Sequence, residues 1–182
     1  MASAIVKISE TDIGGGINTI TLSAIPQGYD DLLLMMHSKS TSTSTHGIQN
    51  YFLYNAANLG NSPYISGWKA IWGRGAGTGS IDGGFIQTEA EYLTSGGATS
   101  QASDIGTFCM RLYMPEYSST AFSKMFQFQY GNVTNSSNDY CEINSGIWSI
   151  GTTTAMTSFN VNLNDGNWAA GSQISLYGIK GT

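Results

Sequence analysis

The stretch from Phe159 to Asn164 reads FNVNLN, and its alternation of large apolar side chains with asparagine decides the fold class. Successive side chains of a β-strand point to opposite faces, so this pattern predicts a strand with one face in a core and the other in water. The same period of two recurs at residues 19–24, 108–114 and 126–130. These segments are therefore predicted to be half-buried strands as well.

Residues 31–37 form a different kind of run, because apolar side chains occur on both faces. This run predicts a central strand that is covered on both sides. Turn residues separate the strand-like segments, as in Ile-Pro-Gln-Gly at 25–28. Further strands are expected at residues 4–9, 49–55, 64–72, 84–88, 140–150 and 173–179, and irregular loops at 14–16, 41–45 and 73–80.

Roughly ten short strands, with no capped helical segment, predict a single all-β domain. A two-sheet antiparallel sandwich of the jelly-roll type is expected, and an up-and-down barrel is the alternative. A glycine triplet at 14–16 divides the chain into two predicted parts. Residues 1–16 would be either the first strand of the sandwich or an arm with a glycine hinge, and residues 17–182 would be the β-sandwich domain.

Charge is scarce in this chain. Only 10 % of the residues are charged, against about 25 % in an average protein, and the formal net charge is -5. The seven lysines and arginines are scattered, so no basic stripe is available for the phosphates of a nucleic acid or for an anionic membrane. The first ten residues lack the apolar run of a signal peptide, and we expect synthesis in the cytoplasm.

The candidate metal ligands do not cluster in the sequence. Cys109 and Cys141 lie in strand-like runs and are expected to be free, mostly buried thiols. His37 is placed in a strand and His46 in a polar loop, neither with a partner at metal-ligand spacing. No metal and no other cofactor is therefore expected.

Catalytic patterns are also weak. A glycosidase needs two carboxyl groups across the scissile bond. Asp30 and Asp31 are adjacent and would point to opposite faces of a strand, whereas Glu89 and Glu91 would share a face. The glycine-rich residues 73–79 lack the Lys-Ser/Thr of a phosphate-binding loop. Surface roles explain these residues better, and the chain is predicted not to be an enzyme.

Aromatic residues provide the candidate contact site. Tyr64, Trp68 and Trp72 fall in one region, followed by Arg74 and the glycine loop. Tryptophan and tyrosine anchor many interfaces, so these four residues are predicted to contact a protein partner or a glycan, with subunit contact favoured. Packing in the core is the alternative role for these rings.

Several short segments resemble, in their order, a family of small structural proteins of tailed bacteriophages. The chain opens with Ile-Val-Lys-Ile at 5–8 and later has Leu-Ser-Ala-Ile-Pro at 22–26 and Tyr-Asp-Asp-Leu-Leu-Leu at 29–34. It continues with Met-Arg-Leu-Tyr-Met-Pro-Glu-Tyr at 110–117 and closes with Ile-Ser-Leu-Tyr-Gly-Ile-Lys at 174–180. In physical terms these are fold residues: Pro26 fixes a backbone angle, and Gly178 leaves room for a close contact.

The resemblance implies a virion protein, most simply a capsid cement (decoration) protein. Such a protein would bind other virion proteins, such as the major capsid protein, and would assemble with itself as a homotrimer. A tail- or head-fibre subunit that binds host surface glycan is the alternative, and a polysaccharide depolymerase ranks third. The resemblance carries no catalytic motif to this chain.

Overall fold

The structure, a computed structural model, describes residues 4–43, 50–54, 65–74, 79–85, 93–94, 108–132, 140–148, 153–163 and 165–181. Strands make up most of this part of the chain, and it contains no helix, so the all-β prediction is confirmed. The strands are β1 (Ala4–Ile13), β2 (Thr19–Leu22), β3 (Asp31–Ser38), β4 (Asn50–Tyr54), β5 (Ile65–Arg74), β6 (Gly79–Phe85), β7 (Leu93–Thr94), β8 (Phe108–Met114), β9 (Lys124–Asn132), β10 (Tyr140–Trp148), β11 (Phe159–Leu163) and β12 (Ser172–Lys180). For β4–β7 and most of β10 only the backbone is described.

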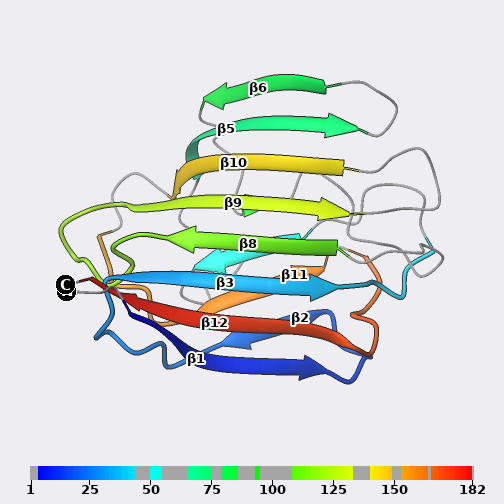
Figure 1. Ribbon diagram of the computed structural model, residues 1–182, viewed down its shortest axis with the longest axis horizontal. Coiled ribbons are helices and arrows are strands. Elements are labelled where there is room, and N and C mark those ends of the chain that lie inside the picture. Colours follow the sequence, from blue (N-terminus) through cyan, green and yellow to red (C-terminus); the bar gives the residue numbers. More distant parts are fainter. Residues whose placement is uncertain are drawn as a thin grey trace.

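The strands form two antiparallel sheets. Sheet A has the order β1-β12-β3-β8-β9-β10-β5-β6, and sheet B has the order β2-β11-β4-β7 (Figure 1). The pairs β1·β12, β2·β11, β3·β8 and β4·β7 are nested, and the strands of this set alternate between the sheets along the chain except at β4 and β7, which are both in sheet B. This winding is that of a jelly roll, as predicted. The jelly-roll plan has eight strands, four in each sheet. The additional strands β5, β6, β9 and β10 extend sheet A on the side of β8.

The core lies between the two sheets, where every second side chain points inward. On β11, Phe159 and Val161 are fully buried and Leu163 is nearly so, which confirms the prediction from the FNVNLN stretch. The inward positions of β3, β8 and β9 complete the apolar layer of sheet A. They are Leu32, Leu34, Met36, Phe108, Met110, Leu112, Met114, Phe126, Phe128 and Tyr130.

The prediction for β3 was wrong in one respect. The strand is central in sheet A, between β12 and β8, but only one of its faces is covered. Met35 is 47 % exposed and Leu33 is half-buried, because sheet B packs on the opposite face. The apolar residues on the outer side of β3 are therefore on the molecular surface.

Some strand ends differ from the predictions. β2 ends at Leu22, two residues early, and Ala24 has a positive φ of 53° that takes the chain out of the sheet. β5 and β6 extend into the glycine-rich segment that was expected to be a loop, and the short β7 was missed. β1 pairs with β12 along its length, and Gly15 and Gly16, both at positive φ, turn the chain toward β2.

The C-terminus lies at one end of the sandwich (Figure 1), where a set of contacts ties it to the β2–β3 and β8–β9 connections. Tyr29 packs its ring flat against the backbone of Gly178, where an added Cβ would lie 2.4 Å from the ring. The Asp30 amide donates to the Ile179 carbonyl at 2.9 Å, and the buried Tyr117 hydroxyl donates to the Pro26 carbonyl. The close approach expected at Gly178 is confirmed.

The β8–β9 connection is held by a buried cation. Lys124 is 1 % exposed, and its ammonium group donates to the carbonyls of Ser119 and Phe122. Burial lowers the pKa of Lys124 because the charged form loses hydration. The two carbonyl bonds compensate for part of that loss, so this lysine acts as an internal brace of the connection.

We predict that Gly178→Ala destabilises the protein by about 1–3 kcal/mol, because the new methyl group overlaps the Tyr29 ring. Chemical denaturation measures the loss. Gly28→Ala is the matched control, since a Cβ at Gly28 meets nothing within 4 Å. In a Tyr29→Ala background the Gly178→Ala change should cost much less, and an undiminished cost would contradict the ring contact.

Candidate interaction site

The outer face of sheet A, the side away from sheet B, carries two ordered rows of side chains. Strand pairing aligns Gln173, His37, Cys109, Gly131 and Cys141 across β12, β3, β8, β9 and β10. The next row consists of Ser175, Met35, Arg111, Gln129 and Ile143 on the same strands. Neighbours within a row lie about 5 Å apart, so the rows form one continuous surface.

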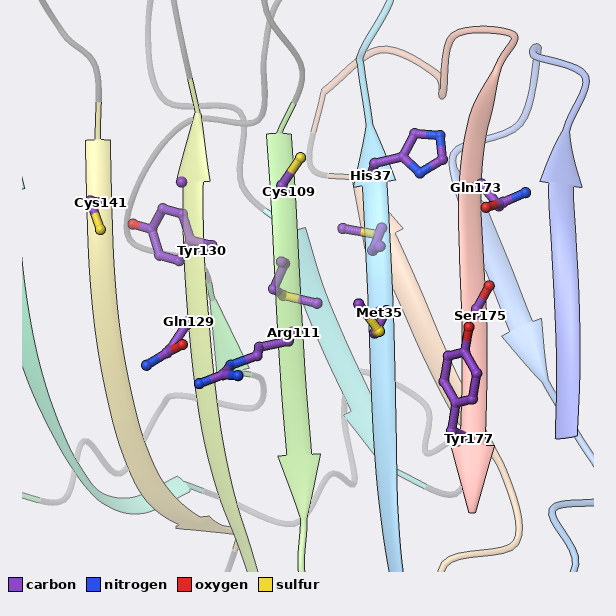
Figure 2. A pocket seen from close by; sticks show the side chains of 13 residues that line it. Met35, His37, Cys109, Arg111, Gln129, Tyr130, Cys141, Gln173, Ser175 and Tyr177 are labelled. Carbon is purple, nitrogen blue, oxygen red and sulfur yellow. The ribbon is translucent and has the colours of Figure 1, made fainter. Parts of the chain in front are cut away.

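A shallow hollow of about 540 Å³ lies over these rows (Figure 2). Gly131 contributes no side chain at the middle of the first row, which leaves room between Cys109 and Cys141. Figure 2 shows Arg111 and Gln129 side by side at one edge of the hollow and His37 at another. We call this region, from Tyr177 on β12 to Cys141 on β10, the outer hollow.

Large apolar side chains are exposed on the outer face of sheet A. Met35, Met125 and Ile143 are 47 %, 51 % and 49 % exposed, and all three point outward. Met35 lines the outer hollow together with Arg111 and Tyr177, whereas Met125 lies four residues along β9 from Gln129. Methionine, tyrosine and arginine are enriched at protein–protein interfaces. The outer hollow is therefore lined by residue types that are common in contact surfaces.

The carboxylates that the structure describes on this face are already paired within the chain. Glu10 accepts from Lys7 at 2.6 Å and from Ser175 at 3.2 Å, which lowers the pKa of Glu10 and raises that of Lys7. Asp12 accepts from the Gln173 side-chain amide at 2.6 Å. Within the described part of the chain, the Lys7–Glu10 pair is the only salt bridge.

Asp31 has two donors of its own. It accepts from the Tyr113 hydroxyl at 2.7 Å and from the Glu116 backbone amide at 3.0 Å. Burial, followed by the hydrogen bond and the charge of Asp31, raises the pKa of Tyr113 to about 12. The neutral phenol is therefore the form that stabilises the folded state.

Arg111 and His37 differ from these groups, because neither is paired with a described carboxylate. Both side chains are exposed, and among the described residues no carboxylate lies in salt-bridge contact with either of them. The described residues also include no group of three or more histidine, cysteine or acidic side chains that could hold a metal ion. The chemistry open to the outer hollow is thus contact with apolar, hydrogen-bonding or acidic groups.

The cysteine prediction was wrong about burial. Cys109 and Cys141 form no disulfide, but both are exposed on the outer face. The reason is register, since each lies opposite Gly131 and points away from the core. Two strand spacings separate them by about 10 Å, beyond the roughly 7 Å limit for bridging by a disulfide.

The structure does not describe the side chains of the four residues that the sequence predicted as the contact site. Trp68, Trp72 and Arg74 belong to β5, of which only the backbone is described, and Tyr64 precedes it outside the described residues. His46, Glu89 and Glu91 also lie outside the described residues. Sequence reasoning missed Met35, Arg111 and Gln129 as a group, because only strand pairing brings them into one row.

Trp168 and Asp165 have structural roles. Trp168 is fully buried in the core. Asp165 accepts from the Ser42 hydroxyl and helps to hold the 40–43 segment against the β11–β12 connection. This segment was expected to be an irregular polar loop, yet Ser40 and Ser42 are buried in it.

Comparison of the chain with protein-family models, with curated proteins and with solved structures finds no match. In the part of the chain that the structure describes, no helix is long and apolar enough to cross a membrane.

We predict that Tyr113 supports stability up to high pH. Its folded pKa of about 12 exceeds the ordinary value of 10, so its contribution is complete below pH 10 and is lost as the pH rises toward 12. Tyr113→Phe should be less stable than the wild type at pH 8, and the difference should shrink between pH 10 and pH 12. Denaturant unfolding across this range measures it, and a constant difference would contradict the pKa assignment.

Proposed function

We propose that the chain is a structural protein of a bacteriophage virion and not an enzyme. Its role is that of a capsid cement protein, which binds other virion proteins, such as the major capsid protein, through the outer face of sheet A. The observation that carries this proposal is the exposure of Met35, Met125 and Ile143 together with Arg111 on one ordered sheet face. The sequence resemblance supplies the virion context.

The energetics of such a contact are ordinary. Burial of apolar surface contributes about 25 cal/mol per Å², and a standard interface buries about 800 Å² on each partner. Sheet A presents its central strands β12, β3, β8 and β9 side by side, which provides a broad and rigid surface of this kind (Figure 1). Assembly as a homotrimer, which we also propose, would multiply the effect by avidity.

A glycan-binding fibre subunit is the second candidate. The outer hollow supports it, because amide groups of Gln129 and Gln173 and the ring of Tyr177 lie around a space of ligand size. Enclosed sites bury most of a small ligand, whereas this hollow is shallow, and for that reason we favour the protein partner. Binding of the purified protein to a glycan array would favour the second candidate instead.

The proposal predicts that Met35→Glu weakens binding to particles assembled without this chain at least tenfold, which corresponds to about 1.4 kcal/mol. The new carboxylate would place a charge in the apolar contact, and because it lies directly opposite Arg111 it would also occupy that guanidinium group. Co-sedimentation of purified protein with the particles measures the affinity, and wild-type addition should raise the temperature at which the particles release DNA.

Thr21→Glu is the matched control. Thr21 is also exposed but lies on β2 in sheet B, so the same charge is introduced away from the proposed contact. Both variants should unfold at the wild-type denaturant concentration, since neither side chain is in the core. Equal loss of binding in both variants, or no binding by the wild type, would contradict the proposal.

A further inference from the structure

We propose that Arg111 is the specificity residue of the outer hollow and binds an aspartate or glutamate side chain of the virion partner. This inference rests on the proposed function, since it names the chemistry of the group that the outer face receives. The partner surface would present one carboxylate surrounded by apolar side chains.

The first argument is the position of Arg111 in the row. It lies directly opposite Met35 on β3 and Gln129 on β9, and its own side chain is exposed. In Figure 2 the guanidinium group reaches toward the Gln129 amide at the edge of the hollow. An incoming carboxylate could accept two parallel bonds from the guanidinium fork and a further bond from the amide of Gln129.

The second argument is that the carboxylates described on this face are held by other groups. Glu10 and Asp12 are on β1, three strand spacings or about 14 Å of backbone from β8. Asp31 lies four residues along β3 from Met35, the residue opposite Arg111, which is again about 14 Å of backbone. All three carboxylates already accept hydrogen bonds from other donors, and among the described residues none forms a salt bridge with Arg111.

The third argument is the environment that a partner would create. Met35 lies beside Arg111, and the outer hollow is lined by Cys109, Cys141 and Tyr177 as well. A docked surface would exclude water from this region and strengthen a charge-assisted hydrogen bond, provided that the carboxylate meets the guanidinium. A partner with an apolar or basic residue at this point would leave Arg111 buried and unpaired, so the residue also selects against wrong partners.

The isolated protein tests the chemistry. The probe is a blocked tripeptide with one glutamate between two leucines, and its control is the same peptide with glutamine. In NMR titrations the glutamate peptide should shift the Arg111 side-chain N–H signal and bind about tenfold tighter than the glutamine peptide. Arg111→Gln should remove this preference, Arg111→Lys should keep a part of it, and Lys180→Gln, which removes an exposed charge at the end of β12, should leave it intact.

Equal binding of the two peptides to the wild type, or a preference that survives in Arg111→Gln, would overturn the inference. Particles assembled without this chain provide the second arm, with their carboxylates either intact or amidated with carbodiimide and glycinamide. Amidation should weaken binding of the wild type and leave binding of Arg111→Gln unchanged.

The two proposals can fail separately. Suppose that the particles bind the wild type, that Met35→Glu no longer binds, and that amidation of the particle carboxylates has no effect. The Arg111 inference is then wrong and the proposed function stands. If particles do not bind the wild type at all, the proposed function is wrong, and the peptide titration still decides whether Arg111 recognises a carboxylate.

Discussion

The pleat of sheet A is the constraint on which the rest of the structure depends. Because side chains alternate between its two faces, each strand that supplies Leu, Met or Phe to the core must place the intervening residues outside. Sheet B covers only one side, so the outward residues of β3, β8 and β9 form a surface whose rows are set by strand register. The exposed Met35 and Arg111 are direct consequences of the buried Leu34, Met36 and Leu112.

Because the chain has few charged residues, the position of each one has a large effect on the electrostatics of the surface. The acidic groups described on sheet A are neutralised or hydrogen-bonded where they stand, as Glu10 is with Lys7 and Asp31 with Tyr113. Arg111 differs from them, since it is exposed in the middle of the sheet and forms no salt bridge among the described residues. It is also the one described lysine, arginine or acidic residue that lines the outer hollow, and this is the feature that a docking partner would meet.

The end of the sandwich near the C-terminus explains why short segments far apart in the sequence are coupled. Tyr29 packs against Gly178, where a larger residue would not fit, and the Tyr117 hydroxyl donates to the Pro26 carbonyl. Asp31 accepts from the Tyr113 hydroxyl and from the Glu116 backbone amide. A jelly roll brings its first and last strands together, so the chain ends must be fixed in relation to the β2–β3 and β8–β9 connections. These contacts belong to the fold, and none of their residues lines the outer hollow.

The sequence by itself determined the all-β class, the single sandwich and most of its strands, because the period of two in segments such as FNVNLN is a local property. It also marked Gly178 as a position for close packing. Only the tertiary structure decided which face of β3 is covered, that Cys109 and Cys141 are exposed, and that Met35, Arg111 and Gln129 share a row. The physical reason is that alternation fixes two faces but not which one packs on the second sheet, and that register between strands distant in sequence depends on the whole winding of the chain.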